Sequence, residues 1–101
     1  MPKGFLYVLQ DIINHRINEN NTTSYTNKLF RSGIYKVAQK VGEEAVELII
    51  EAKDNNPLLF KNEAADLLYH FLILLKLKNL SLEDIEQTLR KRCKKVSTTF
   101  S

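Results

Sequence analysis

Two pairs of acidic residues flank a predicted turn, and they restrict the fold more than any other feature of the chain. Glu44 and Glu47 precede the sequence Asp-Asn-Asn-Pro at residues 54–57, and Glu63 and Asp66 follow it. Each pair has i, i+3 spacing, which places both carboxylates on one face of an α-helix. If the chain reverses within that turn, the two pairs lie almost equally far from the bend. The pattern therefore predicts an antiparallel hairpin of two helices with four carboxylates at one level.

Helical periodicity extends over most of the chain, and only three Gly and two Pro interrupt 101 residues. Apolar recurrence and the cap residues predict five helices, at residues 5–18, 25–31, 34–53, 57–78 and 82–96. No strand pattern and no internal repeat is visible. We expect an all-α bundle of four to five helices as a single domain over residues 1–96, followed by a short tail at 97–101.

The two central helices differ in how they can be buried. The helix at 34–53 has one apolar stripe, with Val46 and Ile50 on another side, which predicts a second partner surface and hence an oligomer. The second half of the helix at 57–78 is apolar nearly all round, so it is expected to be covered on most sides. Because Glu63 and Asp66 lie at its start, we expect them to face protein.

A buried carboxylate without compensation is costly, so these acids are expected to be paired or bound to a metal ion. Mg²⁺ fits because it takes oxygen ligands. The alternative to a metal site is an ordinary solvated acidic face. From spacing alone, we expect Glu43, Glu51 and Glu86 to belong to such a face. A di-iron carboxylate site would need Glu-x-x-His pairs, which the sequence lacks. His70, four residues after Asp66, either orients a carboxylate or contacts substrate, or is an ordinary core histidine.

Four acids and Mg²⁺ suit phosphoryl chemistry, in which the ion shields phosphate charge and activates water. Lys36 and Lys40 flank the acids and could neutralise phosphate oxygens, although exposed lysines also serve solubility alone. No Gly-rich phosphate loop is present. The phosphates are therefore expected to be held by metal and cationic side chains.

The remaining composition favours a soluble cytoplasmic protein. No apolar run is long enough to span a membrane, and the start does not resemble a signal peptide. The one cysteine, Cys93, cannot form an intrachain disulfide and has no catalytic neighbour in the sequence, and His15 has no evident partner. The net charge of +3 depends on five basic residues near the end, Arg90, Lys91, Arg92, Lys94 and Lys95. These suit the end of a helix, so we expect no nucleic-acid partner.

Beyond these patterns, the chain resembles phosphoribosyl-ATP pyrophosphatase, of the all-α nucleoside triphosphate pyrophosphatase superfamily. The resemblance rests on Lys-Val-Gly-Glu-Glu-Ala-Val-Glu at 40–47 and Glu-Ala-Ala-Asp-Leu-Leu-Tyr-His at 63–70. Ser-Tyr-Thr at 24–26 and Leu-Ser-Leu-Glu-Asp-Ile at 80–85 extend it, so that it covers about residues 6–92. The acid blocks are shared across the superfamily, whereas their combination with Ser-Tyr-Thr points to this member.

The resemblance implies Mg²⁺-dependent hydrolysis of the α–β phosphoanhydride of phosphoribosyl-ATP in histidine biosynthesis, by a homodimer. The metal ligands that it implies are Glu44, Glu47, Glu63 and Asp66. Glu43 would be a further ligand or the base for the attacking water, which makes the implied catalytic acids Glu43, Glu44 and Glu47. The implied substrate contacts are Ser24, Tyr25, Thr26, Lys36 and Lys40. Because 101 residues leave no room for the cyclohydrolase to which this activity can be fused, the stand-alone form is expected.

Two alternatives remain open at this point. A superfamily relative could hydrolyse free or noncanonical nucleoside triphosphates with the same acid blocks. A non-enzymatic helical dimerisation module could carry the acids merely as surface charge. Turnover of phosphoribosyl-ATP against dATP and dUTP distinguishes the first, and stabilisation by Mg²⁺ distinguishes the second.

Overall fold

The computed structural model describes residues 4–19 and 24–94, which form five helices and no strand. The helices are α1 (Phe5–Asn18), α2 (Tyr25–Arg31), α3 (Ile34–Ala52), α4 (Pro57–Leu77) and α5 (Leu82–Lys94). The all-α prediction is confirmed, and α3 and α4 end one residue earlier than periodicity indicated. The expected end of the last helix at 96 and the tail at 97–101 lie outside the described residues.

Local hydrogen bonds at the helix ends explain why the boundaries could be predicted. Asn56 accepts a bond from the backbone N–H of Leu59 (3.2 Å) at the start of α4, directly before Pro57. Asn79 follows α4 with a φ of 58°, and the N–H of Leu80 bonds to the carbonyl of Leu75 (2.9 Å). This left-handed ending satisfies the last carbonyls of the helix and turns the chain toward α5.

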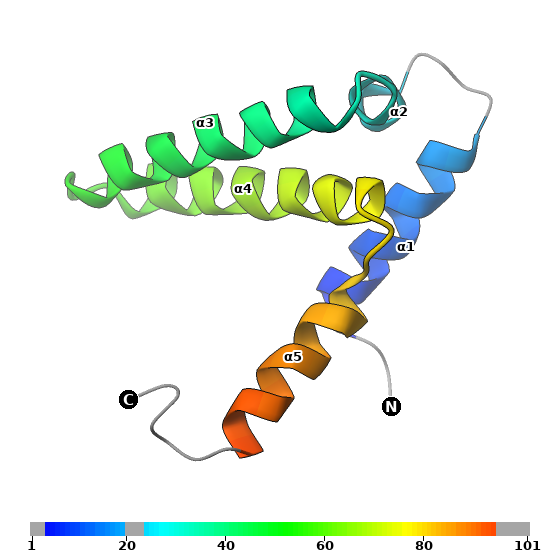
Figure 1. Ribbon diagram of the computed structural model, residues 1–101. Coiled ribbons are helices and arrows are strands. Elements are labelled where there is room, and N and C mark those ends of the chain that lie inside the picture. Colours follow the sequence, from blue (N-terminus) through cyan, green and yellow to red (C-terminus); the bar gives the residue numbers. More distant parts are fainter. Residues whose placement is uncertain (1–3, 20–23, 95–101) are drawn as a thin grey trace.

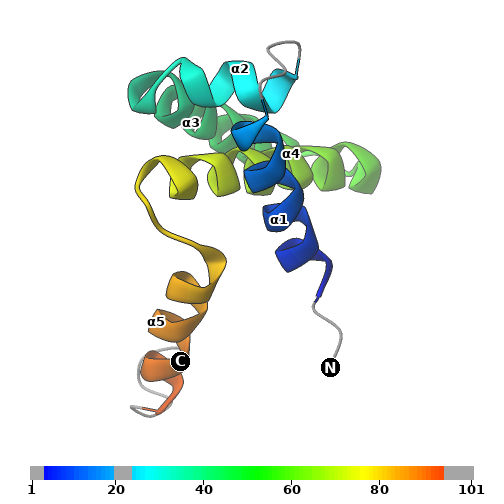
Figure 2. The same cartoon turned by 90° about the vertical axis from the view of Figure 1, so that its right-hand side faces the viewer.

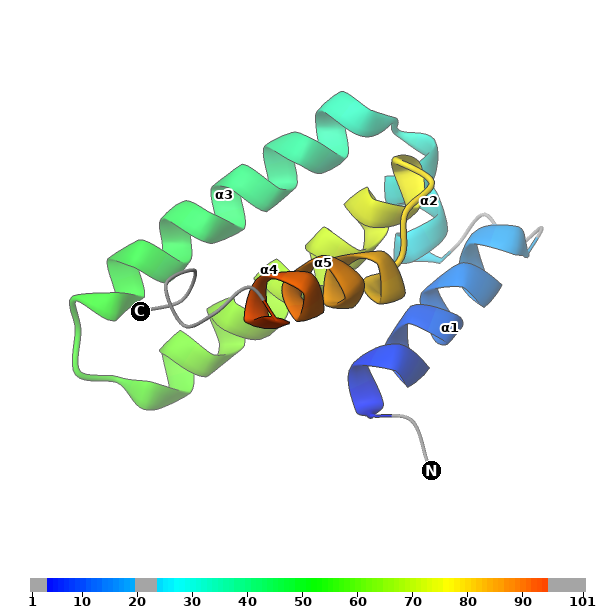
Figure 3. The same cartoon turned by 60° about the horizontal axis from the view of Figure 1, so that its bottom comes forward.

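The centre of the fold is the antiparallel pair α3 and α4, joined by a tight turn at one end (Figure 1). Helix α2 lies at the other end of the pair (Figure 3), and α1 and α5 extend to the same side of α4 (Figure 2). The buried apolar core is small and lies where α1, α2, α3 and α4 meet, at Ile13, Leu29, Val37, Leu72, Ile73 and Leu75. The half of the hairpin that contains the turn therefore extends beyond the core.

Polar side chains attach α5 to α1. Gln10, which is buried, accepts a bond from the N–H of Leu82 (2.7 Å) and donates to Glu83 (2.9 Å), so it caps the start of α5. The Tyr7 hydroxyl donates to Glu86, and this bond raises the pKa of Tyr7 to about 12 and lowers that of Glu86. Glu86 is partly exposed, as expected, and its bond to Tyr7 also joins α5 to α1.

Large apolar side chains remain exposed on two surfaces of the chain. One surface is on α1, at Phe5, Leu6, Val8 and Ile12, and the other is on the hairpin, at Val46, Ile49, Ile50, Leu58, Leu59, Phe60 and Leu68. The radius of gyration is 15.5 Å, against about 13 Å for a compact domain of this length. Within the described part of the chain, no helix is both long enough and apolar enough to cross a bilayer.

Candidate metal centre and active site

The hairpin brings carboxylates of α3 and α4 together at the level that the sequence spacing indicates. Glu44 of α3 and Glu63 and Asp66 of α4 each offer one oxygen, and these oxygens lie within 4.8 Å of one another. The register follows from the short turn, because Glu44 and Asp66 are almost equally distant from it along their helices. Three of the four predicted ligands thus share one small space that can hold a metal ion.

The fourth predicted ligand, Glu47, lies beside this group. Its side chain is exposed, and its carboxylate contributes to the raised pKa of Glu63, although it is not among the three mutually close oxygens. Asp66 is also exposed, which differs from the expectation that both acids of α4 face protein. The reason is that the burial of α4 lies in its C-terminal half, beyond Asp66.

Glu63 bears the strongest electrostatic signal in the group. Desolvation, together with the neighbouring carboxylates of Glu47 and Glu44, raises the pKa of Glu63 to about 7. Glu44 is 8% exposed, and one carboxylate oxygen each of Glu44 and Glu63 is buried without a hydrogen-bond partner. Buried carboxylate oxygens that repel one another and lack donors are the environment that a hard divalent cation relieves. The donor set therefore fits Mg²⁺, which prefers oxygen.

Lys40 is a cation that lies close to the acids of α3. Its ammonium group is 3.6 Å from Glu44 and 4.0 Å from Glu43, so it partly compensates the acidic face of α3. Glu43 itself is exposed and accepts a bond from Gln39 (3.3 Å). Lys36 is exposed one turn earlier on the same helix. A surface hollow of about 770 Å³ adjoins these residues, and it is lined by Gln39, Lys40, Gly42, Glu43, Glu44, Val46, Glu47 and Ile50.

Of the predicted substrate contacts at α2, Ser24 caps its own helix, and Tyr25 and Thr26 bond to α4. Ser24 accepts a bond from the N–H of Asn27 (3.4 Å) and so caps α2. The Tyr25 hydroxyl lies 3.0 Å from Nε2 of His70, and Thr26 bonds to the Tyr69 hydroxyl. His70 is buried, and its other ring nitrogen lies 2.7 Å from the carbonyl oxygen of Asp66.

Sequence reasoning missed the part that Tyr69 plays beside this site and the partial burial of Glu51. Tyr69 bonds to Thr26, and no sequence signal pairs these two residues. Glu51 differs from the expected solvated face, because one of its carboxylate oxygens is buried without a partner.

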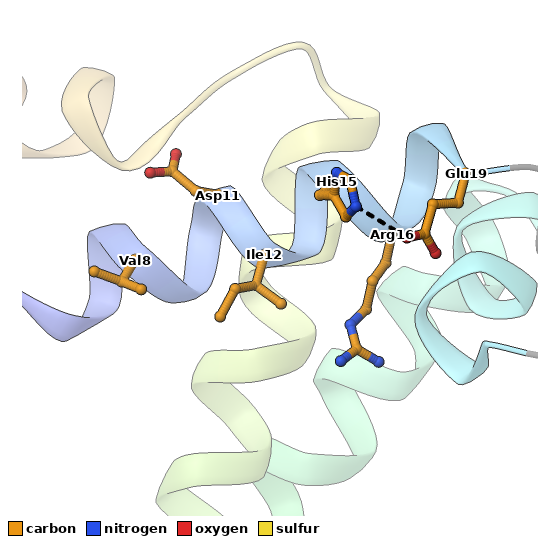
Figure 4. A pocket seen from close by; sticks show the side chains of 6 residues that line it. All are labelled: Val8, Asp11, Ile12, His15, Arg16 and Glu19. Carbon is orange, nitrogen blue, oxygen red and sulfur yellow. Dashed lines mark ion pairs between the residues drawn. The ribbon is translucent and has the colours of Figure 1, made fainter.

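Another hollow, of about 530 Å³, lies on α1 and includes no residue of the hairpin (Figure 4). Its side chains include His15, Arg16 and Glu19, and His15 pairs with Glu19 at 2.9 Å. This i, i+4 pair corrects the expectation that His15 has no partner. Since the hollow has none of the clustered carboxylates, we place the candidate active site on α3 and α4.

Known proteins match the chain over most of its length. The family model described as phosphoribosyl-ATP pyrophosphohydrolase matches residues 6–93. The phosphoribosyl-ATP pyrophosphatase of Clostridium acetobutylicum is 49% identical over 88 residues, which cover 87% of this chain and 80% of the relative. That of Pyrobaculum calidifontis is 48% identical over 86 residues, covering 85% of this chain and 92% of the relative.

Relatives with two activities also match over the same region. The histidine biosynthesis bifunctional protein HisIE of Bacteroides thetaiotaomicron is 48% identical over 91 residues, which cover 90% of this chain but 45% of that protein. The chain thus spans less than half the length of this relative. Because the family match extends over nearly all of α1 to α5 and includes every acid of the cluster, the chain belongs to the phosphoribosyl-ATP pyrophosphohydrolase family.

Proposed function

We propose that the protein hydrolyses the α–β phosphoanhydride of phosphoribosyl-ATP with Mg²⁺, giving phosphoribosyl-AMP and pyrophosphate in the second step of histidine biosynthesis. In this reaction water adds to one phosphorus, and the bridging oxygen leaves with the other. Family membership and the relatives' names support the substrate. The observation that carries the proposal is the group formed by Glu44, Glu63 and Asp66, with two buried oxygens that lack partners.

In this proposal, Glu44, Glu47, Glu63 and Asp66 hold the metal. Mg²⁺, when bound, would shield the polyphosphate charge, acidify a coordinated water and stabilise the oxygen that is displaced. Glu44 and Glu63 would supply the buried side of the site, and the exposed Glu47 and Asp66 would close its open side. Glu63 would have to release its proton, because its raised pKa keeps part of the population neutral near pH 7 without metal.

The residues around the ligands would serve the substrate. Lys40 reaches the edge of the site, and Lys36 follows the same helix toward its N-terminus, so both could pair with phosphate oxygens. Glu43 is exposed beside the hollow and is suited to accept a proton from water or to add a ligand. The adjoining hollow is large enough to admit part of a nucleotide.

The acting unit in the proposal is a homodimer in the cytoplasm. The exposed apolar side chains of α3 and α4 and the small core of the single copy support association through the hairpin. The one cysteine, which cannot form a disulfide within the chain, suits a reducing compartment. In light scattering after gel filtration, the wild type should have twice the chain mass. Ile50→Asp should give the mass of one chain. Lys53→Asp, at an exposed position, is the control and should keep the mass of the wild type. A monomeric wild type would refute the proposed homodimer.

Product analysis by mass spectrometry tests the activity directly. With Mg²⁺ and phosphoribosyl-ATP, the wild type should yield phosphoribosyl-AMP and pyrophosphate, and chelation of the metal should stop the reaction. Parallel reactions with dATP and dUTP should be much slower. A clear preference for the simple triphosphates would move the protein to another branch of the superfamily. Absence of turnover with no thermal stabilisation by Mg²⁺ would instead favour the dimerisation module.

A further inference from the structure

The hydrogen bonds between α2 and α4 suggest a function for the Ser-Tyr-Thr segment other than substrate contact. We infer that Tyr25 and Thr26 are positioning residues, which act through His70 and Tyr69 to fix the turn of α4 that carries Asp66. We call the pairs Tyr25–His70 and Thr26–Tyr69 the α2–α4 latch. The inference rests on the proposed function, because it takes Asp66 as a metal ligand.

The first pair of the latch reaches the backbone of Asp66 itself. Nδ1 of His70 is 2.7 Å from the carbonyl oxygen of Asp66, and since a carbonyl only accepts, Nδ1 must bear the hydrogen. In the neutral imidazole, Nε2 is then an acceptor, and the Tyr25 hydroxyl at 3.0 Å donates to it. The chain of donors thus runs from the Tyr25 hydroxyl through the imidazole to the turn that bears Asp66.

The second pair makes the connection rigid. Thr26 bonds to the hydroxyl of Tyr69, and Thr26 is 4% exposed, so this bond is shielded from water. The ring of Tyr69 packs edge-on against His70 at a centroid separation of 5.2 Å. Consecutive residues of a helix point about 100° apart, so bonds at both Tyr69 and His70 restrict the rotation of α4 as well as its displacement.

Helix α2 can serve as a reference because it is itself fixed to α1. The side-chain amide of Asn27, which is 1% exposed, donates to the carbonyls of Arg16, Ile17 and Glu19 at 3.0–3.2 Å. These bonds satisfy carbonyls at the C-terminal end of α1, where the helix supplies no partners. The anchor of α2 is therefore independent of the carboxylates that it helps to place.

A small rotation of α4 would be sufficient to disturb the proposed metal site. Side-chain ends lie about 6 Å from the axis of a helix, so a rotation of about 10° moves a carboxylate oxygen by about 1 Å. Metal–ligand distances tolerate only about 0.2 Å. Asp66 is on α4 and Glu44 is on α3, so a rotation of α4 changes where the Asp66 carboxylate lies relative to Glu44.

The test removes the hydroxyl groups and keeps the rings. Tyr25→Phe combined with Thr26→Val abolishes both bonds of the latch, and Tyr69→Phe removes one bond with a smaller change. Tyr35→Phe is the matched control, because this tyrosine of α3 is 90% exposed. For each variant, the apparent Mg²⁺ affinity is measured from the Mg²⁺ dependence of the melting temperature and by calorimetry. The KM and kcat for phosphoribosyl-ATP are measured at several Mg²⁺ concentrations.

We expect the double variant to bind Mg²⁺ about tenfold more weakly than the wild type, with Tyr69→Phe intermediate and Tyr35→Phe unchanged. At saturating Mg²⁺, kcat should largely recover and KM should equal that of the wild type. A KM that rises at every Mg²⁺ concentration would show direct substrate contact and overturn the inference. A lower melting temperature with unchanged Mg²⁺ affinity would also overturn it. If the wild type itself did not bind Mg²⁺, the proposed function would be refuted. If the wild type bound Mg²⁺ and the double variant bound it equally well, only the positioning role of Tyr25 and Thr26 would be refuted.

Discussion

Replacement of Glu63 by glutamine is the sharpest perturbation of the carboxylate group, because this side chain combines a raised pKa with a buried oxygen that lacks a partner. Without metal, the folded state binds a proton on Glu63 more tightly than the unfolded state does. The resulting stabilisation is fully present below about pH 4.5 and is lost as the pH rises through about 7. Glu63→Gln cannot ionise, so the metal-free variant should lose this pH dependence while it keeps the shape of the side chain.

The size of the effect follows from the pKa. With a value of about 7, Glu63 is protonated in about half of the metal-free molecules at pH 7, and in about one tenth of them at pH 8. A divalent cation needs the carboxylate, so binding must release that proton. We expect about 0.5 proton released for each Mg²⁺ bound at pH 7 and about 0.1 at pH 8, with little release in Glu63→Gln.

Isothermal titration calorimetry in buffers of different ionisation enthalpy measures this number directly. The heat of Mg²⁺ binding at pH 7 should vary with the buffer for the wild type, and much less for the wild type at pH 8. Asp54→Asn is the matched control, since Asp54 is an exposed acid of the turn between α3 and α4. Proton release near zero for the wild type at pH 7, or equal release from Glu63→Gln, would refute the electrostatic account.

Three further substitutions test separate parts of the structure. Glu47→Gln should lower hydrolysis by about two orders of magnitude while circular dichroism and thermal unfolding stay close to wild type, and retained activity would remove it from the site. Gly33→Ala should destabilise the fold by about 1 kcal/mol, because Gly33 has a φ of 96°, and an unchanged melting temperature would contradict this. Asn27→Ala should cost about 2–3 kcal/mol in chemical denaturation, since three buried bonds are lost, and a loss below about 1 kcal/mol would argue against its role as an anchor.

The helices and the hairpin could be predicted because their determinants are local. Asn56 and Pro57 mark the start of α4, and Asn79 marks its end, within a few residues of the bonds that they make. The meeting of Glu44 with Glu63 and Asp66 follows from equal spacing on either side of a short turn. Such features depend on residues close together in the sequence, so periodicity and cap chemistry are sufficient to find them.

The remaining features depend on contacts between distant segments. Tyr7 and Glu86 are 79 residues apart, and Tyr25 and His70 are 45 apart, so no spacing rule links them. Their pairing depends on how α1, α2 and α5 are oriented against α4, which the packing of the whole chain determines. The same holds for Asp66, whose exposure reflects where along α4 the burial begins.

The short turn between α3 and α4 has a consequence for how this family can vary in length. One extra residue in α4 between the turn and Glu63 would rotate both acids of that helix by about 100° and turn them away from Glu44. An insertion of about seven residues, which is two whole turns, in each of the two helices would keep all four acids facing one another. Members of the family with longer hairpins should therefore have gained their residues in matched steps on the two arms.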